Sequence, residues 1–249
     1  MEATNNFTQQ NLAAKNILIT GGTTGIGRAT ALQLSKLGAN IFIIGQDKNH
    51  LEDAMHDIKK VAMAKSFGIL ADLSSEQEIE SLFNSVKEKF QKIDVLINNA
   101  ALPFGNPEDG SYKDWEKVIS TNLLGVIACS SEALKLMNEG GHIVNIGSMS
   151  ADVREETGSV YVATKSGLQG FTEAFRKNVN QQGIKVTLIE PGAVDTDMQE
   201  KSREEKLEMV RKGEMLASDD IAAAVIYCLS QPKRCDVVEL KVRPHLQLI

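Results

Sequence analysis

Short apolar runs alternate along the chain with longer stretches in which apolar residues recur at helical spacing. The apolar runs occupy residues 17–19, 41–44, 67–70, 95–97, 143–146, 186–189 and 237–240. Several of them are nearly continuous in Ile, Val, Leu and Phe, which is typical of parallel strands covered by helices on both faces. The pattern therefore predicts seven strands in one buried, parallel sheet.

The stretches between these runs predict helices over residues 25–37, 48–60, 75–90, 115–137, 158–182 and 218–229. Ser75 and Ser218 supply N-cap side chains, and Gly38 and Gly183 stand where helix C-caps are expected. Strands that alternate with helices predict an α/β fold: a Rossmann-type, doubly wound domain with a mostly or wholly parallel seven-stranded sheet and helices on both faces. No repeat or linker marks a second domain, so we expect a flexible lead-in over residues 1–12 and one domain over residues 13–249.

One stretch, residues 199–213, is unusually rich in Glu, Lys and Arg. Two interpretations stay open. The stretch forms either a solvated helix or a mobile flap over a pocket.

Composition narrows the classes of function. The 249 residues are 42% hydrophobic and 24% charged with a formal net charge of −6, which is ordinary for a globular protein and argues against nucleic-acid binding. Cys129, Cys228 and Cys235 form no CxxC pair or Cys/His cluster, and His50 and His142 have no partners at ligand spacing, so we expect no metal. Scattered cysteines, a polar N-terminus and the lack of any apolar run of about 18 residues predict a cytoplasmic protein without a membrane partner.

A glycine-rich loop, residues 20–27 (TGGTTGIG), follows the first predicted strand and leads directly into a helix. Glycines let the backbone turn sharply and approach a pyrophosphate, while the helix N-terminus presents free amides to it. The spacing is G-x-x-x-G-x-G, which differs from the usual G-x-G-x-x-G. The alternative is a glycine-rich turn with no ligand.

Tyr161 and Lys165 are four residues apart in a predicted helix, so both side chains lie on one face. A phenol has an unperturbed pKa of about 10, and a nearby ammonium lowers it by favouring the phenolate. By itself, such a pair is also common on solvated helices. Its meaning depends on the rest of the chain.

Other motifs follow the loop in a recognisable order. In chain order they are Asp72-Leu73 after the third strand, Asn98-Asn99-Ala100-Ala101 after the fourth, Asn122 in the next helix, Ser148 thirteen residues before Tyr161, and Pro191-Gly192 with Thr196 after the sixth strand. Together with the loop they resemble the classical type of the short-chain dehydrogenase/reductase family, in whose N-N-A-G motif a glycine stands where this chain has Ala101. The resemblance extends from Lys15 to the last predicted strand.

The resemblance implies roles for four side chains. A carbonyl that accepts a nicotinamide hydride becomes an alkoxide, so an acid must supply a proton; Tyr161 is the expected acid, and the base in the reverse direction. Lys165 is expected to lower the phenol pKa and to hold the nicotinamide ribose, and Ser148 to hydrogen-bond the carbonyl oxygen. Asn122 is expected to hold a water that links Lys165 to solvent. Ser150 is an alternative to Ser148, and Asn122 alternatively caps or kinks its helix.

The choice between NAD and NADP depends on the end of the second strand. An acidic side chain there accepts hydrogen bonds from the ribose hydroxyls of NAD, whereas a basic side chain binds the 2′-phosphate of NADP. By resemblance, Gly45 stands at the aspartate place of NAD enzymes, and Gln46 and Thr24 stand at basic places of NADP enzymes. The missing acid favours NADP, with Gln46, Thr23 or Lys48 as phosphate contacts, and NAD stays the alternative. The expected cofactor contacts are Gly21, Thr23, Thr24, Gly25, Ile26, Gly27, Gln46, Asp72, Leu73, Asn99, Ala100, Tyr161, Lys165, Pro191, Gly192, Val194 and Thr196.

The sequence thus predicts a single dinucleotide-binding and catalytic domain that interconverts an alcohol and a carbonyl on a small-molecule substrate. A dehydratase or epimerase with tightly bound cofactor and a non-catalytic dinucleotide sensor are the alternatives. The resemblance also implies a homo-oligomer, a tetramer or a dimer, paired through the helices that carry Asn122 and Tyr161. Phe171 and Phe175 fit such an interface or a buried core face. Residues 101–110, 151–159 and 194–213 are expected to line the substrate pocket.

Overall fold

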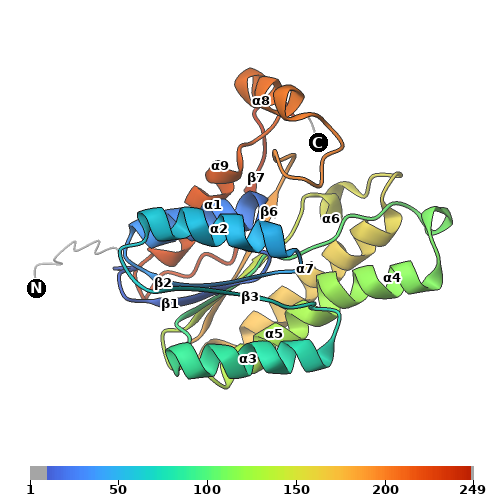
Figure 1. Cartoon of the computed structure of the whole chain (residues 1–249). Helices are drawn as coiled ribbons and strands as arrows, with labels where there is room; N and C mark the ends of the chain where they lie inside the picture. The colour runs from blue at the N-terminus through green and yellow to red at the C-terminus, as the bar shows by residue number, and fades with distance from the viewer. Residues whose placement is uncertain (1–9, 248–249) are drawn as a thin grey trace, which may run out of the picture.

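The strands form one seven-stranded sheet in the order β3-β2-β1-β4-β5-β6-β7 (Figure 1). The computed structural model of the chain describes residues 10–247. Every neighbouring pair of strands is parallel, which confirms the predicted parallel, doubly wound sheet. The strands are β1 (Asn16–Ile19), β2 (Asn40–Gly45), β3 (Ser66–Leu70), β4 (Val95–Asn98), β5 (His142–Ile146), β6 (Lys185–Pro191) and β7 (Glu239–Val242).

Helices cover both faces of this sheet. Those described are α1 (Gly25–Lys36), α2 (Lys48–Val61), α3 (Glu76–Phe90), η1 (Pro107–Asp109), α4 (Tyr112–Ile119), η2 (Ser120–Leu124), α5 (Gly125–Leu134), α6 (Ser150–Val153), α7 (Ser159–Val179), η3 (Asn180–Gln182), α8 (Arg203–Lys212) and α9 (Ser218–Leu229). In Figure 1, α1, α2 and α9 lie over one face and α3, α5 and α7 lie over the other.

Alternating side chains of the strands feed two cores. In β1, Ile17 and Ile19 pack with the α1, α2 and α9 layer, whereas Leu18 packs with the α3, α5 and α7 layer. The same alternation in β2 sends Ile43 to the first layer and Phe42 to the second. Each fully buried side chain of this size contributes about 1.5–3 kcal/mol. Burial on both faces explains why the strands read as continuous apolar runs.

The long helix predicted over residues 115–137 is in fact three consecutive elements. α4 begins earlier, at Tyr112, because Ser111 and Asp114 form a capping box there. A π turn at Ser120–Leu124 then separates α4 from α5. Apolar periodicity does not reveal a π turn, since the helix continues in the same direction on both sides.

The structure agrees with the predicted helix caps at Gly38, Gly183 and Ser75, and differs at Ser218. Gly38 and Gly183 have φ angles of 81° and 70°, as expected for glycines that end helices. Ser75 caps α3, as predicted, by accepting from the amide of Glu78 at 3.4 Å. Ser218 does not cap α9; it is the first helical residue, and its hydroxyl donates to Asp195.

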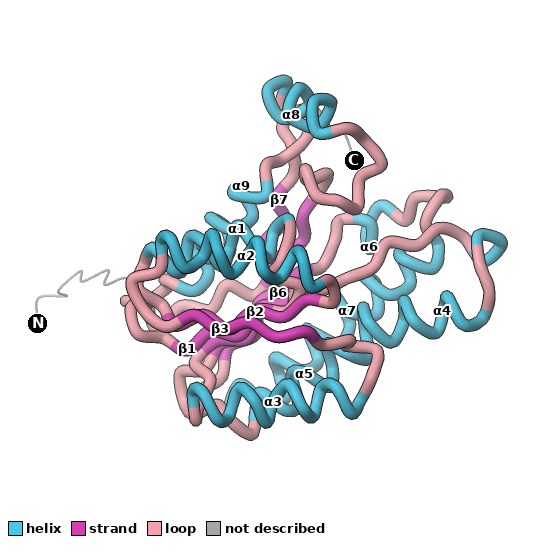
Figure 2. The backbone as a smooth tube through the Cα atoms, in the orientation of Figure 1, coloured by secondary structure: helices cyan, strands magenta, loops and turns pink. Residues whose placement is uncertain are grey.

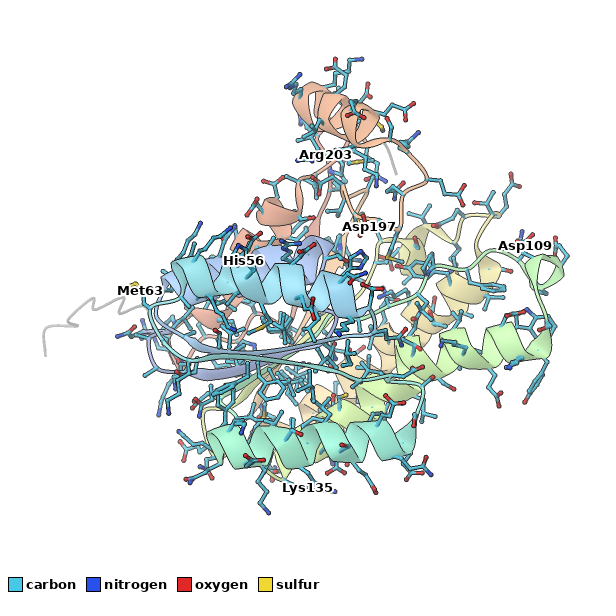
Figure 3. The ribbon with its side chains drawn as sticks, in the orientation of Figure 1. His56, Met63, Asp109, Lys135, Asp197 and Arg203 are labelled. Atoms are coloured by element: carbon cyan, nitrogen blue, oxygen red, sulfur yellow. The ribbon has the colours of Figure 1, made fainter. Side chains whose placement is uncertain are left out.

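The polar stretch over residues 199–213 contains α8, and its helical part has no buried residue. Ser202 and Glu205 form a capping box at its start. In Figure 1, α8 stands away from the sheet at the top of the molecule, and in Figure 3 charged side chains surround it near Arg203. These features match the solvated-helix interpretation.

The N-terminal end of the described chain contacts the fold. The amide of Gln10 donates to the Ser230 carbonyl at 2.8 Å, and Leu12 packs into the core at 7% exposure. Contacts therefore begin before the boundary predicted after residue 12, while residues 1–9 of that lead-in lie outside the described residues.

Between residues 10 and 247, no helix has the length and apolar character required to cross a membrane.

Candidate active site

A cavity of about 850 Å³ opens at the edge of the sheet where the parallel strands end. The loops that leave these carboxyl ends gather at one edge, as Figure 2 shows. In an open parallel sheet, ligands bind at this edge, where β1 and β4 lie side by side but their helices go to opposite faces. The cavity walls come from the loops after β1, β2, β3, β4, β5 and β6, and from α7.

The glycine-rich loop after β1 forms the floor of one end of the cavity. Gly21 has a φ angle of 62°, and a Cβ there would lie 2.8 Å from the Ala100 Cα, so a side chain does not fit. Gly25 has a φ angle of 50° and opens α1 opposite Thr196. Thr24 is the N-cap of α1, but its side chain makes no capping hydrogen bond and the first turn carries no acid. The free amides of this turn suit an anion.

Thr20 joins this loop to the end of β4, a role that sequence reasoning missed. Its buried hydroxyl accepts from the amides of Asn99 at 2.9 Å and Ala100 at 3.1 Å. The Asn99 amide group donates back to the carbonyls of Thr20 at 3.1 Å and Gly21 at 2.9 Å. Asn99 therefore shapes the loop through its side chain. A hydroxyl at the end of a buried apolar strand is the signal that could have indicated the contact.

The end of β2 lines the cavity beside the glycine-rich loop. A Cβ at Gly45 would lie 2.5 Å from Thr23 Cγ2 and 2.7 Å from its hydroxyl, so this position has no room for a side chain. The Gln46 amide donates to Asp72 at 2.9 Å, and Lys117 of α4 pairs with the same carboxylate at 3.1 Å. Burial opposes the ionised form of Asp72, but its hydrogen-bond partners outweigh burial and lower the carboxyl pKa. Asp72 does not line the cavity, whereas the adjacent Leu73 does.

Asp47 and His50 also line this end of the cavity. Asp47 caps α2 by accepting from the His50 amide at 2.8 Å, and this hydrogen bond lowers the carboxyl pKa. The imidazole Nδ1 of His50 lies 3.9 Å from the same carboxylate. Lys48 does not line the cavity and pairs with Glu52 instead. His50, for which the sequence indicated no role, therefore reaches the cavity from the first turn of α2.

Ser148, Tyr161 and Lys165 come together in the cavity wall. Ser148 follows β5, and its side chain lies close enough to the Tyr161 phenol of α7 to lower the phenol pKa. Lys165 lies one turn along α7, with Nζ 5.6 Å from the centre of the Tyr161 ring, so the two side chains share a face as predicted. Nζ donates to the Ile146 carbonyl at 2.9 Å. The Ser150 hydroxyl is turned away, toward Glu155 at 2.5 Å, which favours Ser148 as the phenol partner.

Burial dominates the ionisation of both groups. It raises the pKa of the Tyr161 phenol to about 12, against the effect of Ser148 and with a contribution from the Glu155 carboxylate. It lowers the pKa of the Lys165 ammonium to about 8, against the effect of the Glu190 carboxylate. The lowering of the phenol pKa expected from Lys165 is not found: burial raises this pKa, and Ser148 is the group that opposes the rise.

Asn122 and Gly27 lie behind the cavity wall. Asn122, on the π turn η2, accepts from the Leu102 amide at 2.7 Å and donates to the Leu102 carbonyl at 2.8 Å and to the Thr164 hydroxyl at 3.3 Å. Its side chain therefore fixes the segment after β4. Gly27 lies under the loop, where a Cβ would be 2.1 Å from the Gly21 carbonyl oxygen. The predicted residues that do line the cavity are Gly21, Thr23, Thr24, Gly25, Ile26, Gln46, Leu73, Asn99, Ala100, Ser148, Tyr161, Lys165, Pro191, Gly192, Val194 and Thr196.

The expected substrate loops contribute part of their residues to the wall. Those lining it are Ala101, Leu102, Pro103 and Phe104; Val153, Glu155, Thr157 and Gly158; and Val194, Thr196, Asp197, Met198 and Gln199. Glu155 and Asp197 are the charged members of this set. Sequence reasoning missed Gln247, whose side-chain oxygen accepts from the Ala193 amide at 2.9 Å and so brings the chain end to the cavity.

Outside the cavity, His142 is buried at the start of β5. Its Nε2 lies 2.8 Å from the Thr187 hydroxyl, and burial lowers the pKa of the imidazole to about 3. Within residues 10–247, no three His, Cys, Asp or Glu side chains lie together in a group that could hold a metal ion.

The chain is similar to known proteins over most of its length. The family model described as short chain dehydrogenase matches residues 15–207. An uncharacterized oxidoreductase of Staphylococcus epidermidis is 31% identical over 233 residues, covering 92% of this chain and 97% of that protein. Among solved structures, a short chain dehydrogenase from Burkholderia cenocepacia in complex with NADP is 27% identical, with a TM-score of 0.85 over 94% of this chain and 98% of that one. A metagenomic short-chain oxidoreductase in complex with NADP is 25% identical, with a TM-score of 0.81 over 96% and 100%.

Proposed function

The chain belongs to the short-chain dehydrogenase family, and we propose that it interconverts an alcohol and a carbonyl by hydride transfer with NADP(H). One observation carries this proposal: Ser148, Tyr161 and Lys165 line the same cavity as the glycine-rich loop. That arrangement brings a proton donor and an anion site to one cavity.

The cavity suits a dinucleotide. The loop glycines leave a cradle that a Cβ would fill, and the free amides of α1 face it. When bound, the nicotinamide supplies or accepts the hydride. Thr23, Thr24 and the amides of the first turn of α1 would hold the phosphates, and Leu73 and Ala100 would contact the adenosine half of the cofactor.

We propose that Tyr161 donates its proton to the carbonyl oxygen during reduction and takes it back during oxidation. With its pKa at about 12, the phenol stays protonated near neutral pH, as an acid must. Ser148 donates a hydrogen bond to the developing alkoxide. Lys165 places its charge beside the phenol, and Asn122 supports the site by fixing Leu102 and Thr164.

NADP is the proposed preference over NAD. An aspartate at position 45 would collide with Thr23, so the acid that binds ribose hydroxyls in NAD enzymes has no room there. Asp47, the nearest acid, caps α2. His50 and Thr23 line this end and can donate hydrogen bonds to a 2′-phosphate, whereas the Gln46 amide is bonded to Asp72. Two structural relatives were also solved with NADP.

We also propose that the protein is a homo-oligomer paired through α4, α5 and α7. Leu124 of η2 and Ile127 of α5 are 58% and 37% exposed, and η2 packs against α7. Phe171 and Phe175 of α7 stack with ring centres 5.0 Å apart, and both are partly buried. Exposed apolar side chains on neighbouring helices are typical of a subunit interface.

The test is a titration with NADPH and NADH, followed by a panel of carbonyls with the cofactor that binds more tightly. We expect NADPH to bind more tightly and at least one carbonyl to be reduced. Tyr161→Phe should retain cofactor binding and lose turnover by about 10²–10⁴-fold, the usual contribution of a general acid. NADH affinity tenfold above that for NADPH would contradict the cofactor preference. Unchanged turnover in Tyr161→Phe would contradict the proposed proton donor.

A further inference from the structure

Glu190 is a buried carboxylate that the proposed hydride transfer does not use. It lies on β6, one residue before Pro191 in the cavity wall, and its side chain is 0% exposed. Gly147 of the neighbouring strand end lies beside it, since a Cβ on Gly147 would be 3.1 Å from Glu190 Cγ. A buried carboxylate at this depth requires partners for both of its oxygens.

The two carboxylate oxygens of Glu190 differ in their surroundings. Gln169 of α7 donates to Oε1 at 2.9 Å. Oε2 has no hydrogen-bond donor among the residues that the structure describes, and Lys241 Nζ of β7 lies 3.7 Å from it. Lys241 is shared, because it also pairs with Asp152 of α6 at 2.5 Å and with Glu239 of β7 at 3.0 Å. One lysine therefore faces three carboxylates and leaves Glu190 incompletely neutralised.

Lys165 lies on the same side of α7 as the residue that binds Glu190. Lys165 and Gln169 are four residues apart in this helix, so their side chains leave one face. Lys165 Nζ donates to the carbonyl of Ile146, which directly precedes Gly147. The buried ammonium and the buried carboxylate thus occupy one layer, between α7 and the ends of β5 and β6.

We propose that Glu190 is the counter-charge of Lys165, a positioning residue that keeps the ammonium protonated beside Tyr161. The proposal rests on the proposed function, in which that ammonium acts on the phenol. A buried ammonium loses its hydration, and an opposite charge within about 4–6 Å restores part of the stability of the charged form. The charge of Glu190 does oppose the fall of the Lys165 pKa, while burial and the nearby Asp152 and Glu239 raise the pKa of Glu190 itself.

The sign of the effect follows from the charges around the pair. Lys165 faces Tyr161 on α7 and Glu190 on β6, and Glu155 acts on Tyr161 from the loop before α7. Removing the negative charge of Glu190 makes proton loss from the Tyr161–Lys165 pair easier. The apparent pKa values of the pair then fall together, whichever group loses its proton first.

The experiment compares the wild type with Glu190→Gln, which keeps the shape of the side chain and removes its charge. The first measurement is the pH dependence of kcat/KM for carbonyl reduction with NADPH. We expect the alkaline limb of Glu190→Gln to move to lower pH by about one unit, the low end of what a nearby opposite charge produces. Glu239→Gln, which removes an exposed charge from the same cluster, should leave the limb where it is in the wild type.

The second measurement does not require turnover. Acetic anhydride modifies neutral amines, so its rate of reaction with Lys165 at pH 7, followed by peptide mass spectrometry, reports the neutral fraction. Lys165 should react up to about tenfold faster in Glu190→Gln, the factor for one pKa unit, and at the wild-type rate in Glu239→Gln. If Glu190→Gln does not fold, Gln169→Leu replaces it. Without the donor to Oε1, the Glu190 carboxylate is protonated more easily and carries less negative charge, so both readouts should change in the same direction.

Equal labelling and equal pH profiles in the wild type and Glu190→Gln would overturn the proposal, as would equal changes in Glu190→Gln and Glu239→Gln. A wild type that reduces no carbonyl, with Lys165 still labelled faster in Glu190→Gln, would overturn the proposed function and leave the counter-charge supported.

Discussion

Replacing Thr20 with Val tests how the phosphate loop is held against β4. Val has nearly the shape of Thr, so the change removes one hydroxyl without opening a cavity. That hydroxyl is buried and accepts from the amides of Asn99 and Ala100 at 2.9 and 3.1 Å. A buried donor that loses its acceptor costs about 1–3 kcal/mol, and these two amides are partly buried, so we expect a loss of about 2–4 kcal/mol. For a chain of this size, that corresponds to a Tm lower by about 5–10 °C.

Thr30 provides the matched control on α1. It is also buried, but its hydroxyl has no hydrogen-bond partner among residues 10–247. Thr30→Val should therefore leave stability unchanged or raise it by up to about 1 kcal/mol. Urea unfolding of both variants, followed by NADPH titration, provides the comparison, and only Thr20→Val should also bind the cofactor more weakly. Equal stability of the two variants would refute the assignment of Thr20 as the joint between loop and sheet.

Three other changes have defined outcomes. Gly45→Asp places its Cβ about 2.5 Å from Thr23, so NADPH affinity should fall by at least about tenfold in a fluorescence titration, and an unchanged affinity would contradict the cofactor geometry. Glu155→Gln should raise kcat/KM for carboxylate-bearing carbonyls relative to their amides, whereas Glu156→Gln, outside the cavity, should not; equal ratios would argue against charge selection by Glu155. His142→Leu tests pH dependence. The imidazole pKa is about 6.5 in the unfolded chain and about 3 in the folded protein, so below pH 6.5 the unfolded state binds more protons. The free energy of unfolding therefore decreases as the pH is lowered. From pH 7 to 5 the wild type should lose about 2 kcal/mol more than the variant in urea unfolding, and parallel losses would exclude His142 as the cause.

The sequence predicts the sheet well because both of its faces are buried. Burial on both faces makes Ile17, Leu18 and Ile19 apolar without a break, and the same holds for the other central strands. The last strand is predicted less well: residues 237–240 were expected, whereas β7 spans Glu239–Val242. It is one of the two edge strands, and Glu239 and Lys241 are exposed, so its apolar pattern is interrupted. The π turn after α4 has no periodic signal at all.

The sequence predicts a site residue well where the motif itself carries the side chain that lines the site. Ser148, Tyr161 and Lys165 meet as their spacing suggested. Contacts between distant segments are different. Nothing in the local sequence places Gln247 against Ala193, or brings the charge of Glu190 to act on Lys165, because both depend on how segments far apart in the sequence pack together.

The same burial acts on Tyr161 and Lys165 in opposite directions. Removing water disfavours the charged form of each, so it raises the phenol pKa to about 12 and lowers the ammonium pKa to about 8. Burial alone would therefore favour a neutral phenol beside a neutral amine near the upper end of the physiological pH range. Such a pair could donate a proton but would give little stabilisation to the phenolate left behind. A fixed negative charge at Glu190 counters this on the lysine side, whereas Glu155 on the tyrosine side adds to the effect of burial. In the proposed mechanism, the site would thus retain a proton on the phenol for reduction and a positive charge beside it for the phenolate that reduction would produce.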